Sequence, residues 1–327
     1  MAGDRDLAVA VAAAWRLRVG RPLSGWEPTA ATGVRGLRLL NESGAFGRFL
    51  LTEASDAAGP VLRDNAARWP NVTVETGDGR VPPGAGPFDY VDVDPYGSPV
   101  PFVPSALEAL RSGGLLAVTA TDMMVLAGVQ KGACERKYGA RPIRGRLGPE
   151  GGLRILLAYL AGEARSRGRA ARPVLAYVRE HHVRAFVHVT VADDRPDPVG
   201  QIDPSAWTGP WVGDRGPYGP LWLGPLFDPD LVRTLAVPAS AAAPRETARF
   251  LATVREELSA DVPFYFEANR LAAALSLPAP PPLDAFLAGL RRAGYRAART
   301  HARPEGFRTD APRVEVEGLA RSLAAPD

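Results

Sequence analysis

The segment from Phe88 to Asp122 constrains the fold of this chain more than any other. An apolar run at 90–93 leads into Asp94-Pro95-Tyr96-Gly97, helical spacing follows at 103–111, and 115–119 has the pattern of a second buried strand. This order of strand, polar tip, helix and strand is typical of a parallel α/β unit, whose chemistry lies at the carboxyl end of the first strand. The segment therefore predicts an α/β fold with Asp94 at its functional edge.

The residues at that tip suit methyl transfer to an exocyclic amine of a nucleobase. Such an amine is a weak nucleophile because its lone pair is spread into the ring. A carboxylate at Asp94 can accept the N–H hydrogen bond and draw the lone pair out of conjugation. Pro95 fixes the turn, and Tyr96 can stack on the base. On the tetrapeptide alone, a purely structural strand end with Tyr96 packed at its rim is an equally good explanation.

Polar residues also follow three earlier strands. A strand at 24–30 precedes a turn at Gly33, although its glycine and proline are unfavourable inside a strand. The next predicted strand ends in Glu53, which can hold ribose hydroxyls, and the third is followed by Asp78, which can meet an adenine amino group. Together with Asp94, their order and spacing match S-adenosylmethionine binding in class I methyltransferases.

Length and composition predict two domains without a membrane segment. The chain has 327 residues, of which 46% are hydrophobic, and we expect a cofactor-binding domain at 1–195 and a smaller domain at 196–327. Helices followed by strands at 295–300 and 313–316 predict an α+β, winged-helix-like second domain, with a plain accessory packing domain as the alternative. No apolar run reaches ~18 residues, and no secretory signal opens the chain, so a cytoplasmic protein is expected.

The cysteine content and the distribution of charge limit which ligands and partners the chain is expected to bind. Cys134 is the only cysteine, so neither an internal disulfide nor a cysteine-based zinc site is expected, and we predict no metal. The formal net charge is +3, but arginines cluster at 165–172 and 291–308. Either cluster could be a solvated face, yet in a chain with base-modifying chemistry a nucleic-acid partner is the better interpretation.

Short motifs from Arg5 onward carry a resemblance to one family. They are Arg5-Asp6-Leu7, Ala31-Thr32-Gly33-Val34-Arg35-Gly36, Asp92-Val93-Asp94-Pro95-Tyr96-Gly97-Ser98-Pro99, Val118-Thr119-Ala120-Thr121-Asp122, Arg136-Lys137-Tyr138 with Pro142-Ile143-Arg144-Gly145, Gly219-Pro220-Leu221-Trp222-Leu223-Gly224-Pro225, and Gly294-Tyr295 with Arg299-Thr300-His301. In these motifs the sequence resembles the tRNA guanine-26 N2-dimethyltransferases of archaea and eukaryotes.

The resemblance implies a class I methyltransferase with a Rossmann-like sheet. The expected reaction adds one or two methyl groups from S-adenosylmethionine to N2 of guanine 26 in tRNA, by a monomer, with Asp94, Pro95 and Tyr96 at the target base. The residues expected at the cofactor are Arg5, Thr32, Gly33, Arg35, Glu53, Asp78, Gly79 and Asp92. Those expected at the RNA are Lys137, Arg141, Arg144, Arg291, Arg292, Arg299, His301 and Arg308.

The chain departs from the family pattern in three places. Family members usually carry Phe-Tyr-Asn-Pro ahead of the Arg5 motif, Cys-His-Glu near Gly148-Pro149-Glu150, and often four cysteines before the Trp222 motif; of these only Glu150 is present. Two alternatives therefore stay open. One is methylation of another exocyclic amine, such as adenine N6, and the other is a catalytically inactive RNA-binding factor.

Overall fold

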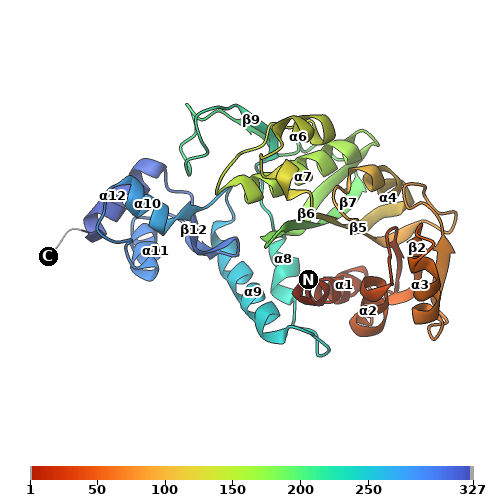
Figure 1. The fold of residues 1–327 in the computed structure, drawn as a ribbon. Helices are drawn as coiled ribbons and strands as arrows, with labels where there is room; N and C mark the ends of the chain where they lie inside the picture. The colour runs from red at the N-terminus through yellow and green to blue at the C-terminus, as the bar shows by residue number, and fades with distance from the viewer. Residues whose placement is uncertain (1, 325–327) are drawn as a thin grey trace.

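The computed structural model describes residues 2–324, and its centre is a seven-stranded sheet in the order β3-β2-β1-β4-β5-β7-β6 (Figure 1). The first five strands in this order are parallel, and β7 runs antiparallel to both of its neighbours. This arrangement confirms the α/β fold. The strands are β1 (Leu23–Glu27), β2 (Phe46–Glu53), β3 (Val72–Thr76), β4 (Phe88–Val93), β5 (Leu110–Ala120), β6 (Arg169–Arg179) and β7 (His182–Val191).

The strand order reverses between β1 and β4, and in open α/β sheets ligands bind outside the carboxyl ends of the strands at such a point. All six residues of β4 are buried, as expected for a parallel strand covered on both faces. The glycine that argued against a strand at β1 has a packing reason. A Cβ on Gly25 would lie 2.4 Å from the Phe49 ring of the neighbouring strand.

Helices cover both faces of the sheet (Figure 1). One face carries α1 (Ala2–Val19), α2 (Val34–Ser43) and α3 (Ala58–Ala66), and the other carries α4 (Val103–Ala109) and α7 (Gly148–Arg165). Shorter elements follow the tips of β4 and β5: η1 (Val100–Phe102), α5 (Met123–Leu126) and α6 (Lys131–Tyr138). Helix α6 lies within a polar, basic stretch of the chain, and Cys134 and Tyr138, four residues apart, share its buried side.

The remaining chain forms a short hairpin, two connecting helices and a small module at one end of the molecule (Figure 1). The hairpin and connecting helices are β8 (Val199–Ile202), β9 (Tyr218–Trp222), α8 (Pro229–Thr234), α9 (Pro244–Glu257) and η2 (Leu258–Ala260). The module contains β10 (Phe266–Glu267), α10 (Ala268–Ala274), α11 (Leu283–Arg292), β11 (Ala297–Thr300), β12 (Arg303–Thr309) and α12 (Arg313–Ala324), with sheet order β10-β12-β11.

The strand predicted at 313–316 is wrong, because these residues begin α12. The partner of β11 is instead β12, which a proline and a glycine concealed. A Cβ on Gly306 would lie 2.7 Å from the Thr300 side chain, so the glycine allows the two strands to approach. Helices followed by a hairpin are thus present, while the winged-helix likeness of the module stays a prediction.

Two hydrophobic cores divide the molecule. The larger takes its residues from Leu7 to Tyr265, and the smaller from Phe266 to Ala320. The predicted domain boundary at 195/196 stays a prediction. The described chain does show that β9, α8 and α9 contribute to the larger core.

Helix α1 joins the two ends of the larger core. The Asp6 carboxylate accepts hydrogen bonds from the backbone N–H groups of Ala242 and Ala243, at 3.0 and 2.8 Å, and from the Thr247 hydroxyl at 3.3 Å. These groups form the amino end of α9, whose first N–H groups have no partner within their own helix. A side chain of α1 therefore caps a helix more than 230 residues away.

Candidate active site at the carboxyl edge of the sheet

Asp94 and Arg35 form the centre of the site. Asp94 follows β4, Arg35 lies in the first turn of α2, and Arg35 Nη2 is 2.5 Å from Asp94 Oδ2. Burial raises the pKa of Asp94, but the Arg35 and Arg184 guanidinium groups and the Thr119 hydroxyl outweigh burial and leave the pKa below its ordinary value. At neutral pH Asp94 is therefore a carboxylate, which only accepts hydrogen bonds.

A buried layer supports this pair from below. Arg184 on β7 lies 2.7 Å from Asp92 Oδ2 through Nη2 and donates to the Thr119 hydroxyl across 2.5 Å. The Tyr90 hydroxyl donates to the same Asp92 oxygen at 2.8 Å. Asp92 was predicted to contact the cofactor. The structure buries it completely, so its observed contacts hold Arg184 and Tyr90.

Two residues of this layer were missed in the sequence. Glu27 ends β1 and accepts the Gly36 N–H at 2.9 Å. Burial and the neighbouring Asp92 raise its pKa well above the ordinary value, which favours the protonated form. Glu27 could have been found in the sequence as an acid at the end of the strand before the glycine turn. Arg184 could have been found as a single arginine inside an apolar strand.

A cavity of about 460 Å³ opens beside Asp94. Its walls include the loop after β4, α1 and the turn between β6 and β7. The lining residues that were not predicted as site residues are Asp4, Gly97, Thr119, Thr121, Glu180, His181, His182 and Arg184. Tyr96 also lines the cavity, and its side chain is fully exposed. The alternative in which Tyr96 packs at the strand rim is therefore wrong.

The loops after β1, β2 and β3 bring most of the predicted cofactor residues to the same edge. Glu53 accepts hydrogen bonds from the N–H groups of Ala31, at 2.6 Å, and Ser55, at 2.8 Å. Gly33 has a φ of 81°, which favours glycine. Gly79, in the loop after β3, lies against the loop after β1, since a Cβ on Gly79 would lie 2.1 Å from the Pro28 carbonyl oxygen.

The charged groups at this edge fit a nucleoside ligand that carries an amino acid. Among residues 2–324, the buried Nε and Nη1 of Arg35 have no hydrogen-bond partner, so they can donate to a ligand carboxylate. Asp78 is exposed, and its hydrogen bonds from Arg80 lower its pKa to about 2. Arg5 lies in the first turn of α1, and the Thr32 carbonyl oxygen accepts from Asn65 at 2.9 Å.

The predicted RNA-binding residues fall into three places. Lys137, Arg141 and Arg144 lie on α6 and the loop after it, where Lys137 Nζ is 3.6 Å from Asp122. Arg291, Arg292 and Arg299 lie on the terminal module. The last two, His301 and Arg308, have side chains that are 1% and 0% exposed.

His301 and Arg308 therefore do not form part of an RNA surface. Both bind the buried Glu257 carboxylate, and Arg308 also binds Glu150. The arginine cluster at 165–172 is likewise engaged: Arg165 and Arg172 pair with acids of the loop after β7, and Arg169 donates to backbone carbonyls. The exposed arginines of α11 and of the α6–α7 loop are the better candidates.

Across residues 2–324, no group of three or more His, Cys, Asp or Glu side chains is arranged to hold a metal ion. In the same residues no helix has the length and apolar character needed to cross a membrane.

Comparison with known proteins places the chain in a family. The family model for N2,N2-dimethylguanosine tRNA methyltransferase matches residues 1–201 and 213–321. The tRNA (guanine(26)-N(2))-dimethyltransferase of Thermococcus kodakarensis is 36% identical, over 95% of this chain and 89% of the relative. The tRNA (guanine(26)-N(2))-dimethyltransferase of Pyrobaculum calidifontis is 34% identical, over 99% of this chain and 90% of the relative.

A solved structure agrees with these relatives. Trm1 from Pyrococcus horikoshii, in complex with S-adenosyl-L-methionine, is 28% identical and superposes with a TM-score of 0.84 over 98% of this chain and 92% of that one. The order of the strands, the site at their carboxyl ends and these matches lead to one conclusion. The chain belongs to the N2,N2-dimethylguanosine tRNA methyltransferase family.

Proposed function

We propose that this protein transfers one or two methyl groups from S-adenosylmethionine to the exocyclic N2 of guanine 26 in tRNA. The family match and the relatives' names support the reaction and the base. The observation that carries the proposal is the Asp94 carboxylate, which Arg35 holds ionised beside the exposed Tyr96.

S-adenosylmethionine supplies a methyl group on a positively charged sulfur, and the residues that would hold it surround the carboxyl ends of β1 to β3. Arg35 would bind the carboxylate of the methionine part, Glu53 the ribose hydroxyls and Asp78 the adenine amino group. The remaining members of the proposed cofactor set are Arg5, Thr32, Gly33 and Gly79.

Asp94 would act on the guanine. Its carboxylate accepts a hydrogen bond from N2–H, which localises the nitrogen lone pair for attack and leaves an acceptor in place for the proton that the amine must lose. This work is done in the transition state, so it raises the rate more than the binding of either substrate. Tyr96 would stack on the flipped base, and Pro95 would fix the distance between the two.

The tRNA would be held by exposed cations outside the cavity. Lys137, Arg141 and Arg144 lie on α6 and the loop after it, and Arg291, Arg292 and Arg299 lie on the terminal module. Arginine forks suit phosphate oxygens. His301 and Arg308 are left out of this proposal because they are buried.

Nucleoside mass spectrometry tests the proposal. Unmodified tRNA incubated with protein and S-adenosylmethionine should yield N2-methyl- and N2,N2-dimethylguanosine, and a transcript with adenosine at position 26 should yield neither. N6-methyladenosine would instead support the alternative enzyme. Tight tRNA binding without any methylated nucleoside would support the inactive RNA-binding factor.

We include a monomeric state in the cytoplasm in this proposal. Light scattering coupled to size-exclusion chromatography should give one mass near that of a single chain, with and without tRNA.

A further inference from the structure

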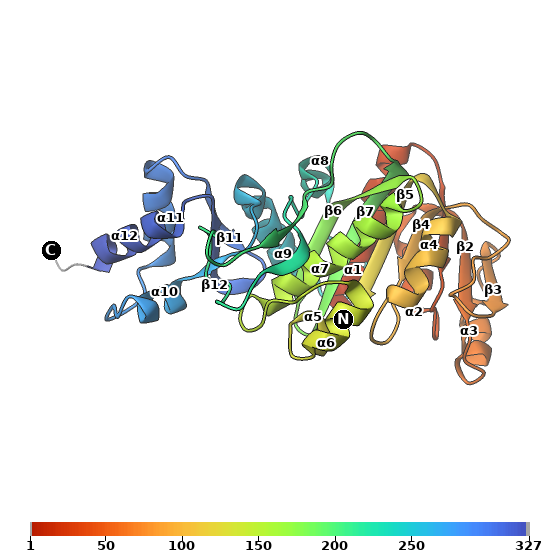
Figure 2. The ribbon, with the colours of Figure 1, turned by 90° about the horizontal axis from the view of Figure 1, so that it is seen from above.

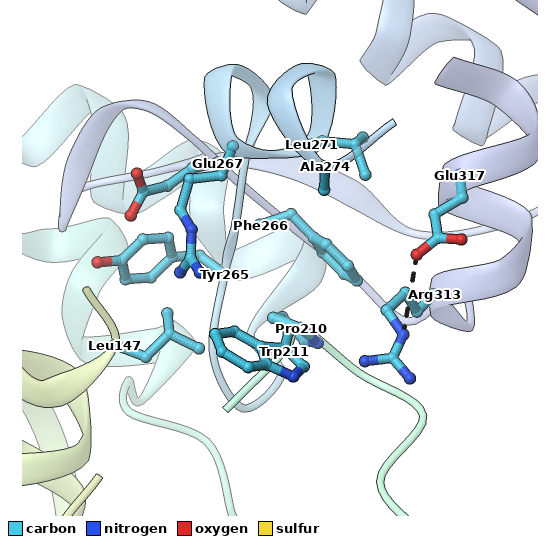
Figure 3. A pocket seen from close by; sticks show the side chains of 11 residues that line it. Leu147, Pro210, Trp211, Tyr265, Phe266, Glu267, Leu271, Ala274, Arg313 and Glu317 are labelled. Carbon is cyan, nitrogen blue, oxygen red and sulfur yellow. Dashed lines mark ion pairs between the residues drawn. The ribbon is translucent and has the colours of Figure 1, made fainter. Parts of the chain in front are cut away.

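A second hollow surrounds the indole of Trp211, outside the set of residues that lines the cavity at Asp94. Its volume is about 140 Å³. Figure 3 shows Trp211 and Leu147 on one side of the hollow and Phe266 and Leu271 on the other. Trp211 is 55% exposed, and the Arg270 guanidinium carbon lies 5.5 Å from its ring centroid. A large exposed ring at the mouth of an apolar hollow marks a binding surface.

The backbone that precedes Trp211 is held in place by a second tryptophan. Trp207 donates its indole N–H to the Pro210 carbonyl at 2.7 Å and packs edge-on against Phe264, with ring centroids 6.2 Å apart. These contacts fix the backbone directly before Trp211. The family model leaves residues 202–212 unmatched, so the segment that carries Trp211 lies outside the shared family pattern.

Glu267 also lines the hollow, and its side chain is only 3% exposed. One carboxylate oxygen lies 3.6 Å from Arg146 Nη1, and the other has no hydrogen-bond partner anywhere in residues 2–324. Although Glu267 precedes α10, its side chain makes no capping hydrogen bond. A buried acceptor without a donor is unfavourable. A ligand N–H that donates to this oxygen would remove that cost and bind more tightly for it.

A basic hollow adjoins the apolar one. It measures about 300 Å³, shares Leu147, Trp211 and Arg270 with the first, and adds Arg144 and Arg146. Both of these arginines are exposed. A ring platform, a buried acceptor and two exposed cations, of which Arg146 pairs with Glu267, thus meet within one surface, which matches the base, the base edge and the phosphate of a nucleotide.

This surface is connected to the site at Asp94. The Tyr138 hydroxyl at the end of α6 lies 2.9 Å from the Ser98 hydroxyl and donates to Asp122 at 2.9 Å. The chain then runs from Tyr138 directly into the loop that carries Arg144 and Arg146. In Figure 2, α6 and α10 lie toward the same side of the molecule. A folded RNA that reaches Asp94 would therefore pass the Trp211 hollow.

We propose that the Trp211 hollow binds a second, unstacked base of the tRNA, and that this base carries an amino group. The inference rests on the proposed function and names a further contact of the same substrate. Guanine fits best, because its N1–H and N2–H can both donate to the Glu267 carboxylate. Cytosine and adenine offer one amine, whereas the N–H of uracil lies between two carbonyl oxygens that a carboxylate repels. Arg144 and Arg146 would hold the adjoining phosphate.

The first test uses the full chain and an unmodified tRNA transcript. Trp211→Ala should weaken tRNA binding roughly 5- to 150-fold, the effect of losing one stacked base, and Trp211→Phe should restore most of it. The affinity for S-adenosylmethionine and the single-turnover rate at saturating tRNA should stay as in the wild type. The control Val191→Ala removes another exposed apolar side chain and should leave binding unchanged.

The second test addresses the base. Five-nucleotide uridine strands with a central guanosine, inosine or uridine are titrated while tryptophan fluorescence is followed. Guanosine should bind most tightly, inosine more weakly because it lacks the 2-amino group, and uridine least. Glu267→Gln should reduce these differences. Arg144→Ala with Arg146→Ala should weaken the binding of all three strands alike, whereas Arg233→Ala, at an exposed arginine of α8, should weaken none.

The outcomes separate this inference from the proposed function. If the wild type methylates guanine 26 and Trp211→Ala binds tRNA as tightly as the wild type, the second site is refuted and the reaction stands. Equal affinity for the three strands would refute the role of Glu267 and with it the base. If the strands bind in the expected order but no tRNA is methylated, the proposed reaction fails instead.

Discussion

Arg308 donates from Nη1 to Glu150 Oε1 across 2.8 Å, and both side chains are buried. Arg308 also binds Glu257, whose carboxylate is fully buried and accepts from the His301 backbone N–H as well. Glu150 belongs to α7 and Arg308 to β12. The pairing thus joins α7, which covers one face of the seven-stranded sheet, to the terminal module through side chains that are fully buried.

Replacing Arg308 should therefore destabilise the protein strongly. Arg308→Met leaves two buried carboxylates without their shared partner, and breaking a buried ion pair in this way costs about 3–5 kcal/mol. Urea unfolding measures the difference. Arg296→Met is the matched control, since Arg296 is 58% exposed and pairs with Asp310 at the surface, so its loss should cost about 1 kcal/mol or less. Equal effects of the two would contradict the structural role of Arg308.

The same network gives stability a dependence on pH through Asp261. Burial raises the pKa of Asp261 from 3.8 to about 6. The folded state therefore binds more protons than the unfolded state between these values, so this contribution is complete below about pH 4 and is lost as pH rises through about 6. The loss amounts to about 3 kcal/mol.

Asp261→Asn cannot ionise and should lack this loss. Unfolding free energies measured from pH 4 to 8 should fall more steeply with pH in the wild type than in this variant. Glu257 gives the opposite slope at lower pH: burial raises its pKa, but His301 and Arg308 outweigh it and lower the pKa to about 2. Its contribution is lost only as pH falls from about 4.5 toward 2. Parallel curves for the wild type and Asp261→Asn between pH 4 and 8 would rule out the raised pKa.

Asp94→Asn should remove methyl transfer and retain most cofactor binding. The amide keeps the size of the side chain but presents a weaker acceptor and no negative charge to the amine. We expect a rate below a tenth of the wild-type single-turnover rate, with the affinity for S-adenosylmethionine changed only slightly, by calorimetry. Because the pKa of Asp94 is lowered, its ionisation should not limit the wild-type rate between pH 5 and 7. A variant that keeps more than a tenth of the rate would exclude Asp94 as the acceptor.

Glu53→Ala should weaken S-adenosylmethionine binding by about 1.5–3 kcal/mol, the value of a charge-assisted hydrogen bond. Glu53 also accepts a hydrogen bond from the Ala31 N–H in the glycine turn. Because glutamine can still accept that bond, Glu53→Gln should lose less affinity for S-adenosylmethionine than Glu53→Ala. Calorimetry compares both with Glu75→Ala, an exposed acid on the adjacent β3. Unchanged affinity in Glu53→Ala would remove it from the cofactor site.

The tRNA affinity should fall when Arg291, Arg292 and Arg299 are replaced by neutral residues, and it should then depend less steeply on the salt concentration. Each phosphate contact that is lost should reduce the slope of log K against log salt by about 1. Glutamine is the appropriate substitute, because Arg291 and Arg299 lie beside Glu256 and Asp284 and a reversed charge would repel these acids. A triple variant with the wild-type slope would shift the RNA surface to Lys137, Arg141 and Arg144.

The carboxyl edge was predictable because its residues follow directly from strand ends. Glu53 ends a predicted strand, Asp78 and Asp94 follow strands closely, and Gly33 lies in the turn after the first strand. Parallel strands bring their carboxyl ends together whatever the details of packing. The alternation of strand and helix was likewise enough to predict the sheet.

The buried positions of Arg184 and Arg308 could not be predicted from the sequence, because their partners are distant along the chain. Arg184 meets Asp92 from a strand 92 residues away, and its inward direction depends on the register of β7. Arg308 looks like one more cation in a basic run, but its partner Glu150 is 158 residues away. Charge alone does not distinguish an arginine that faces water from one enclosed between two glutamates.

The hydrogen bonds between Asp6 and the amino end of α9 join α1 to residues that are made much later. During synthesis, α1 is made well before the groups at Ala242, Ala243 and Thr247 that the Asp6 carboxylate binds, because these groups lie more than 230 residues further along the chain. Asp4, on the same helix, lines the cavity beside Asp94. A nascent chain therefore completes the contacts of α1 only after α9 has been made, and a product truncated before α9 would lack this cap.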